Sequence, residues 1–302
     1  MSDQVHIVEV GPRDGLQNEK TPVSVNDRVT FIETLLAAGL HTVEVGAFVS
    51  PKAIPQMVGS DEVLRRVNRI DGGEFHVLVP NEKGYEAARA AGAKVIAVFA
   101  SASEGFSHAN INCSVAESIE RFKPVIARAR ADGVKVRGYV SCVLGCPFDG
   151  EIKSQAVVDV AKILWDLGCY EISLGDTIGV GTPKKARELL RAAAGHVPMA
   201  HLAMHFHDTY GQALANLYAG LEEGARVIDS AAGGLGGCPY APGATGNVAT
   251  EDVVYMLEGL GVATGVDMAK LVNATNAISK LLGRPPLSRV AAALNAKRLA
   301  GR

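Results

Sequence analysis

The stretch Ala91-Gly92-Ala93-Lys94-Val95-Ile96-Ala97-Val98 carries the pattern on which the predicted fold of this chain depends. A helical segment ends in glycine, and an apolar, β-branched segment follows immediately. Glycine suits the left-handed conformation that commonly closes a helix, so the stretch predicts a junction between a helix and a strand. The same pattern recurs at residues 38–45, 132–139, 167–174 and 223–229.

Three further apolar segments, at residues 5–10, 74–79 and 202–207, bring the number of predicted strands to eight. Helical stretches separate these strands, and the interval between units is roughly 25–50 residues, which suits one strand plus one helix. Strands that alternate with helices form parallel sheets, and eight units favour a closed (β/α)8 TIM barrel. An open doubly wound sheet is the alternative, but no Gly-x-Gly-x-x-Gly motif follows the first strand.

The length and composition suit one large domain. The chain has 302 residues, of which 48% are hydrophobic and 21% charged. We expect a single barrel domain over residues 1–302, with the barrel at about 5–262 and a C-terminal helical segment at about 266–283. That segment would cap the barrel or face a partner. We expect the tail, residues 296–302, to be frayed.

The charge pattern and the termini exclude several classes of protein. The net charge is −2 with the two signs interspersed, so we expect neither nucleic acid nor an anionic membrane as a partner. No apolar run approaches the length of a membrane span, and the N-terminus lacks a signal pattern. Five cysteines, an odd number, suggest reduced thiols and a cytoplasmic location. The Cys142-x3-Cys146 spacing is not typical of zinc sites, so we expect small buried residues there.

The segment Met204-His205-Phe206-His207-Asp208-Thr209 reads as the end of the seventh strand. Side chains alternate along a strand, so His205 and His207 face the same way, roughly 7 Å apart. Active sites of (β/α)8 barrels lie at the carboxyl ends of the strands. Two imidazoles there could bind one divalent ion, or they could simply be a hydrogen-bonded pair.

Other polar side chains occupy the ends of predicted strands, and each has a structural alternative. Asp14 follows the first strand and could cap a turn, whereas Glu44 lies on the second and could pair with a buried arginine. Asp176 ends the sixth strand and could cap the next helix. Their convergence on one barrel mouth favours a site, because an aspartate with two imidazoles can hold a divalent cation and leave coordination positions open.

The loop after the eighth strand, residues 233–247, contains six glycines and two prolines. A loop of this composition can move, approach ligands closely and exclude water when closed. A phosphate-binding loop is the alternative, but the Gly-Lys-Ser/Thr ending of a P-loop is absent. Cys238 lies in the middle of the loop, where an acid/base, thiol-redox or ligand-contact role competes with simple packing.

Four stretches of the sequence carry a family resemblance: Gly11-Pro12-Arg13-Asp14-Gly15-Leu16-Gln17-Asn18-Glu19, Tyr139-Val140-Ser141-Cys142-Val143-Leu144-Gly145-Cys146-Pro147, His205-Phe206-His207-Asp208-Thr209-Tyr210-Gly211-Gln212 and Gly236-Gly237-Cys238-Pro239-Tyr240 through Gly246-Asn247. Together they resemble the 3-hydroxy-3-methylglutaryl-CoA lyase family, over roughly residues 5–283. The Arg-Asp and His-x-His pieces are shared with a wider superfamily of metal-dependent barrels that make or break carbon–carbon bonds, whereas the loop around Cys238 is more specific to the lyase.

The resemblance implies a site with two sets of residues. The divalent cation, Mg²⁺ or Mn²⁺, would be surrounded by Asp14, His205, His207 and Asn247. The other catalytic positions would be Arg13, Glu44 and Cys238. Two imidazole ligands would by themselves suit manganese, cobalt or zinc. We expect Glu44 and Asp176 to orient other groups rather than to react.

The implied reaction cleaves 3-hydroxy-3-methylglutaryl-CoA to acetyl-CoA and acetoacetate, a step in leucine degradation and ketone body metabolism. A base removes the C3 hydroxyl proton, and negative charge collects on the thioester oxygen as the C2–C3 bond breaks. Arg13 is suited to stabilising that oxygen, and Cys238 could protonate the enolate carbon. Asp14 and His205 both remain candidates for the base.

Three other functions remain open. A synthase of the same superfamily would condense an acyl-CoA with a 2-oxo acid, but it usually carries extra C-terminal domains. A lyase for a related 3-hydroxy-3-carboxymethyl acyl-CoA would keep every motif. A non-catalytic scaffold for metal or CoA would not need Arg13 and Cys238. The resemblance also suggests a homodimer, and the chain shows neither a mitochondrial leader nor a peroxisomal ending.

Overall fold

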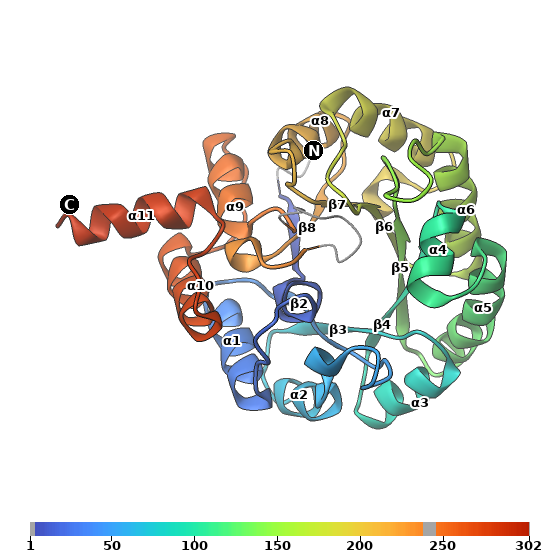
Figure 1. Cartoon of the computed structure of the whole chain (residues 1–302), viewed down its shortest axis with the longest axis horizontal. Coiled ribbons are helices and arrows are strands. Elements are labelled where there is room, and N and C mark those ends of the chain that lie inside the picture. The colour runs from blue at the N-terminus through green and yellow to red at the C-terminus, as the bar shows by residue number, and fades with distance from the viewer. Residues whose placement is uncertain (1–3, 238–245, 302) are drawn as a thin grey trace.

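Eight parallel strands form a closed barrel in the computed structural model, which describes residues 4–237 and 246–301 (Figure 1). Each strand pairs with the next in chain order, and β8 pairs with β1. The predicted (β/α)8 barrel is therefore confirmed. The strands are β1 (His6–Glu9), β2 (Thr42–Ala47), β3 (Glu74–Leu78), β4 (Val95–Ser101), β5 (Lys135–Ser141), β6 (Glu171–Asp176), β7 (Leu202–Phe206) and β8 (Val227–Ser230).

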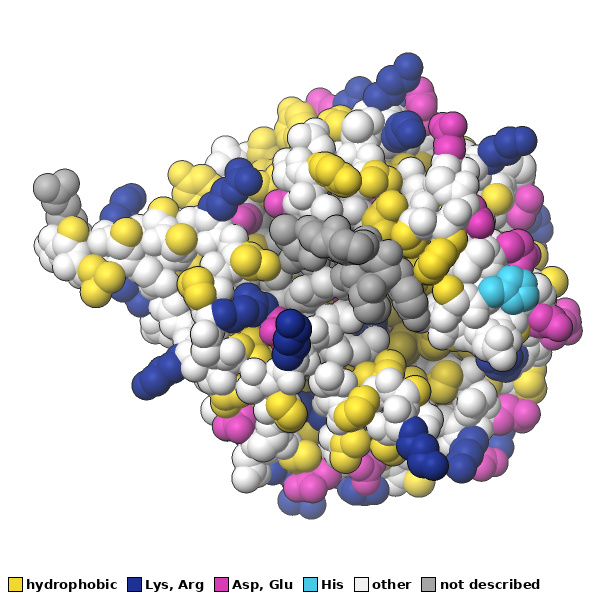
Figure 2. Space-filling view, in the orientation of Figure 1, with side chains coloured by type: hydrophobic (Ala, Val, Ile, Leu, Met, Phe, Trp, Pro, Cys, Tyr) yellow, Lys and Arg dark blue, Asp and Glu magenta, His cyan; other side chains and the backbone are white. Residues whose placement is uncertain are grey.

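Helices surround the barrel on its outer side (Figure 1). In the described parts of the chain, no helix is both long and apolar enough to span a bilayer. On the face seen in Figure 2, positive and negative side chains alternate around the edge of the molecule. The helices are α1 (Val25–Ala37), α2 (Ser60–Val67), α3 (Glu82–Ala90), α4 (Glu104–Ile111), α5 (Val115–Ala131), α6 (Ser154–Leu167), α7 (Pro183–Ala194), α8 (Ala213–Glu222), α9 (Thr250–Gly259), α10 (Met268–Leu282) and α11 (Arg289–Leu299).

The glycines that end the helices before the strands behave as the pattern predicts. The backbone at Gly39 has φ +99°, and a side chain there would place its Cβ 2.3 Å from the carbonyl oxygen of Gly265. Glycine is thus required both by conformation and by the close approach of the segment before α10. The corresponding glycines of the other four junctions, Gly92, Gly133, Gly168 and Gly224, also have positive φ.

The structure corrects the prediction for the C-terminal end. Residues 296–302 were expected to be frayed, but α11 continues to Leu299. The helix begins at a cap assembled from a distant residue: Asp252 of α9 accepts hydrogen bonds from the Ser288 hydroxyl and from the backbone N–H of Val290. In Figure 1, α11 extends away from the barrel. Helix α4, between β4 and α5, was likewise not predicted.

The interior of the barrel is polar near its centre. Arg137 of β5 and Asp229 of β8 are both fully buried, and two of their atom pairs lie 2.7 Å (Nη2–Oδ1) and 2.9 Å (Nη1–Oδ2) apart. Strands β5 and β8 are not neighbours in the sheet, so this ion pair crosses the interior. Branched aliphatic side chains dominate the interior of most such barrels. Here paired charges occupy part of that space.

A second buried carboxylate, that of Glu9, connects segments from the beginning and the end of the barrel by hydrogen bonds. Glu9, on β1, accepts hydrogen bonds from the backbone N–H of Gly11 (2.8 Å) and of Ala232 (2.9 Å), and from the Thr250 hydroxyl (2.6 Å). It therefore links the turn after β1 to the turn after β8 and to the start of α9. Burial, which outweighs these hydrogen bonds, raises the pKa of Glu9 from 4.5 to about 7.

This pKa predicts how the stability contributed by Glu9 changes with pH. Because the folded pKa is raised, the folded chain holds this proton more tightly than the unfolded chain, and stability is lost as the pH rises from about 4.5 through about 7. Glutamine resembles the protonated acid but does not titrate. Wild type should therefore lose stability as the pH rises from about 5 to about 8, while Glu9→Gln does not. Over this interval the unfolding free energy of the variant minus that of wild type should increase by about 1–3 kcal/mol. Denaturant unfolding at several pH values measures this difference, and a pH-independent difference would contradict it.

Candidate metal centre

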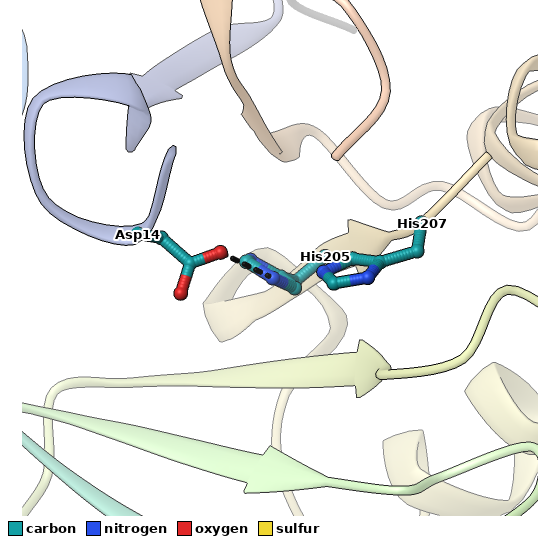
Figure 3. Close-up of side chains that lie close together, drawn as sticks. All are labelled: Asp14, His205 and His207. Carbon is teal, nitrogen blue, oxygen red and sulfur yellow. Dashed lines mark ion pairs between the residues drawn. The ribbon is translucent and has the colours of Figure 1, made fainter. Parts of the chain in front are cut away.

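Asp14, His205 and His207 offer ligand atoms that all lie within 4.8 Å of one another. Figure 3 shows the three side chains pointing toward one another, with Asp14 approaching from the segment after β1 and the histidines from the end of β7. Asp14 lies in one π-helical turn, Gly11–Gly15, in which the N–H groups of Asp14 and Gly15 both donate to the carbonyl of Val10. Such turns are rare and occur often at functional sites.

The alternation of side chains along β7 brings the two histidines together as predicted. Their ring centroids are 5.4 Å apart, and both residues are buried. Burial, with the neighbouring His205, lowers the pKa of His207 to about 4, so its imidazole is neutral near pH 7. Burial also opposes the charge on His205, but the carboxylates of Asp229 and Asp14 raise its pKa above the ordinary value.

Asp14 is held as a carboxylate by its neighbours. Its Oδ1 accepts a hydrogen bond from Arg13 Nη1 (2.7 Å), and its Oδ2 accepts one from Asn247 Nδ2 (2.8 Å) and lies 3.8 Å from His205 Nε2. Burial by itself would raise the pKa of Asp14, but Arg13 and the two histidines lower it to about 2. The site therefore contains a fixed negative charge at neutral pH.

Two buried polar atoms at this site have no hydrogen-bond partner among the described residues: His207 Nδ1 and Asn247 Oδ1. Leaving such an atom unsatisfied typically costs about 1–3 kcal/mol. A bound divalent cation would satisfy both atoms, because neutral imidazole, amide oxygen and carboxylate are ligands that such ions accept in proteins. The donor set at this centre therefore fits a divalent cation.

Arg13 and Glu44 form a second, adjoining pair. Arg13 Nε donates to Glu44 Oε2 over 2.6 Å, and the guanidinium also lies over the ring of Tyr139, 5.8 Å from its centroid. Burial disfavours the guanidinium charge, yet Glu44 and Asp14 keep the pKa of Arg13 above its usual range. The structural alternative considered for Glu44, a pairing with a buried arginine, is thus present. It also places Arg13 beside the candidate metal centre.

Asp229 is a neighbour of this site that the sequence reasoning missed. Its Oδ2 lies 3.2 Å from His205 Nδ1 and accepts hydrogen bonds from Arg137 and from the Ser173 hydroxyl. The signal in the sequence was an acid within the apolar strand Val227–Ser230, which is the same signal that identified Glu44.

The predicted site residue Asp176 directs its carboxylate to its own loop rather than to the candidate centre. The side chain of Asp176 is buried and accepts hydrogen bonds from the backbone N–H of Val180 (3.2 Å) and Gly181 (2.8 Å), so it holds its own loop. The backbone carbonyl oxygen of Asp176 accepts a hydrogen bond from the backbone N–H of His207 over 3.4 Å. The orienting role of Asp176 stays a prediction. Cys238 lies outside the described residues, so its role also stays a prediction.

A closed parallel barrel with a carboxylate and two imidazoles at the carboxyl ends of its strands is the arrangement that metal-dependent barrel enzymes use. Comparison with known proteins gives the family. A family profile described as HMGL-like matches residues 4–278, and the chain belongs to the HMGL-like family.

Individual relatives cover nearly the whole chain. It is 58% identical over 294 residues to a 3-hydroxy-3-isohexenylglutaryl-CoA/hydroxy-methylglutaryl-CoA lyase of Pseudomonas aeruginosa. The alignment covers 97% of this chain and 98% of the relative. The crystal structure of hydroxymethylglutaryl-CoA lyase from Pseudomonas aeruginosa matches with a TM-score of 0.96, 57% identity and coverage of 98% and 99%. An HMG-CoA lyase from Acinetobacter baumannii, solved with coenzyme A and 3-methylmalate, matches with a TM-score of 0.93, 36% identity and coverage of 97% and 96%.

Removing either imidazole should weaken metal binding while leaving the fold intact. Loss of an outer-shell partner alone typically costs about 10–100-fold in affinity, so His205→Ala and His207→Ala should each weaken Mn²⁺ binding by at least about 10-fold. Calorimetric titration of the metal-free protein measures this change, and circular dichroism checks the fold. His108→Ala, at an exposed histidine of α4, is the matched control. Wild-type titration curves for both variants would exclude these two residues as ligands.

Proposed function

We propose that this protein is a divalent-metal-dependent lyase that cleaves 3-hydroxy-3-methylglutaryl-CoA to acetyl-CoA and acetoacetate. The observation that carries the proposal is the near-complete match to lyases of this name, at 55–58% identity over about 97% of the chain, together with a donor set that fits a divalent cation. The HMGL-like family is metal-dependent. A relative solved with coenzyme A supports an acyl-CoA substrate.

The centre supplies the groups that the first step requires. Asp14, His205, His207 and Asn247 would hold the cation, which would act as a Lewis acid and lower the pKa of the substrate's C3 hydroxyl. Removal of the hydroxyl proton allows the C2–C3 bond to break, with C3 becoming the ketone of acetoacetate. The bonding electrons pass to the acetyl-CoA fragment as a thioester enolate.

Arg13 is placed to stabilise that enolate. Its described contacts use Nε and one N–H of Nη1, and Nη2 lies 2.6 Å from Glu44, so further N–H groups of the guanidinium stay available to a substrate oxygen. Glu44 and Asp14 hold the guanidinium in place before substrate arrives, and a preorganised donor needs no rearrangement as charge develops. In this proposal Glu44 positions Arg13 rather than contacting the reacting atoms.

A second substrate follows from the name of one relative. The Pseudomonas aeruginosa lyase at 58% identity is named for 3-hydroxy-3-isohexenylglutaryl-CoA as well as for the methyl compound. The two thioesters differ only in the C3 branch, so every group proposed above would serve both. We therefore retain the longer-branched thioester as a second candidate substrate.

The direct test is incubation of purified protein with 3-hydroxy-3-methylglutaryl-CoA, Mg²⁺ or Mn²⁺ and a thiol reductant. Acetoacetate and acetyl-CoA should form in equal amounts, and chelation of the metal should stop their formation. A parallel reaction with the isohexenyl thioester tests the second substrate. Binding of CoA thioesters without any cleavage of either one would favour a non-catalytic scaffold and contradict the proposal.

Arg13→Lys should separate stabilisation of the transition state from docking of the substrate. Lysine keeps the positive charge but loses the planar set of donors, and the enolate charge exists mainly in the transition state, so kcat should fall more than KM rises. A loss on the order of 10²-fold in kcat is expected, as for removal of one oxyanion donor. Steady-state kinetics measure both constants, with Arg191→Lys on the surface of α7 as control. An increase confined to KM would instead make Arg13 an anchor for the ground-state substrate.

Four finer assignments stay predictions. They are Mg²⁺ or Mn²⁺ as the ion, a homodimer, a cytoplasmic location and Cys238 as the group that protonates the enolate carbon. Asp14 and His205 both stay candidates for the base.

A further inference from the structure

The two ring nitrogens of His205 have different surroundings. Nδ1 lies 3.2 Å from Asp229 Oδ2, and Nε2 lies 3.8 Å from Asp14 Oδ2, on the side of the candidate metal centre. An ionised carboxylate is only an acceptor, so its partner on the imidazole must be an N–H. The contact with Asp229 therefore places the ring proton on Nδ1 and leaves the lone pair on Nε2.

Three hydrogen bonds hold the carboxylate of Asp229 in place as an acceptor. Arg137 donates to both of its oxygens, and the Ser173 hydroxyl donates to Oδ2 over 2.8 Å. Because the always-charged guanidinium of Arg137 donates to both oxygens, Asp229 is an ionised carboxylate and acts only as an acceptor.

Arg137 is fixed in turn from the opposite side. Its Nε donates to Glu171 over 2.6 Å, and its Nη1 donates to the Tyr139 hydroxyl over 2.8 Å. The rings of Tyr139 and His205 form a T-shaped contact with centroids 5.9 Å apart. The orientation of His205 is thus set by side chains from β5, β6 and β8.

The second imidazole has no comparable support. His207 Nδ1 is buried and has no hydrogen-bond partner within the described part of the chain. Two histidines of one site therefore differ: the tautomer of His205 is imposed by a carboxylate, whereas that of His207 is not imposed by any described donor or acceptor.

We propose that Asp229 is a positioning residue that imposes the Nδ1–H tautomer on His205 and so aims its Nε2 lone pair at the divalent cation. This inference rests on the metal-dependent function proposed above. It predicts that His205 is the preorganised ligand of the pair. Carboxylates that orient metal-binding histidines in this way typically contribute about 10–100-fold to metal affinity.

The tautomer can be read in the unmodified protein. In metal-free protein labelled with ¹⁵N-histidine, at an alkaline pH where the ring is neutral, the nitrogen shifts of His205 report which nitrogen carries the proton. His205→Ala assigns the signals. A protonated Nδ1 and an unprotonated Nε2 are expected. A protonated Nε2, or a mixture of both tautomers, would overturn the proposal without any substitution of Asp229.

Removing Asp229 alone would leave Arg137 buried and poorly paired, which threatens the fold. The test variant therefore combines Arg137→Met and Asp229→Leu with Glu171→Gln, because replacing a whole buried ionic cluster by apolar or neutral groups is often tolerated. The matched control is Glu171→Gln alone, which removes the charge of one partner of Arg137 but keeps its hydrogen-bond acceptor and the Asp229–His205 contact. Mn²⁺ should bind about 10–100-fold more weakly to the triple variant than to the control. The control should stay within about 3-fold of wild type, which is below the roughly 10–100-fold range for loss of an outer-shell partner.

A double-variant cycle with His205→Ala distinguishes positioning from a general loss of structure. If Asp229 acts through His205, adding the three substitutions to His205→Ala should not weaken Mn²⁺ binding further. Equal losses in both backgrounds, or a folded triple variant with the control's affinity, would overturn the proposal. A wild-type protein with the expected tautomer and Mn²⁺ affinity but no lyase activity would instead overturn the proposed function and leave this inference standing.

Discussion

The ion pair between Arg137 and Asp229 is the interaction on which the candidate site most depends. Both side chains are fully buried, and the pair joins strands that are not neighbours in the barrel. Taking one partner from a buried pair typically costs about 3–5 kcal/mol, because the remaining charge cannot return to water. The pair therefore resists rearrangement, and the carboxylate that it fixes lies next to His205.

From this pair, contacts continue outward to the mouth of the barrel. Asp229 contacts His205, His205 faces Asp14, and Asp14 accepts a hydrogen bond from Arg13, which in turn pairs with Glu44. The carboxylates alternate with arginine or histidine along this series, and His205 contributes an N–H donor toward Asp229 rather than a fixed charge. A polar interior of this kind positions catalytic groups with side chains of the strands themselves, which move less than loops do.

The fold could be predicted from the sequence because its signals are local. A glycine at the end of a helix acts through its own backbone angle, and the alternation that pairs His205 with His207 spans two residues. The partners of those groups could not be predicted, because Arg137 and Asp229 are 92 positions apart. The cap of α11 has the same character, since Asp252 reaches residues more than 30 positions away.

Among the candidate site residues, too, the sequence predicted the position of each group but not its contacts. Asp14, His205 and His207 were expected from their places at strand ends, and Glu44 as an acid within an apolar strand. The structure brings all four to one mouth of the barrel. Asp176 occupies an equivalent place, but the nearest donors to its carboxylate are the N–H groups of its own loop. Position at a strand end therefore identifies candidates, whereas the hydrogen bonds available around each carboxylate decide what it contacts.

The central claim is that Asp14, His205 and His207 bind one divalent cation together. Anomalous diffraction from crystals grown with Mn²⁺ tests it most directly. The account predicts a single strong anomalous peak within bonding distance of one atom from each of the three side chains, with His205 contributing Nε2. A peak that contacts only one of them, or a protein saturated with Mn²⁺ whose peak lies elsewhere, would contradict it.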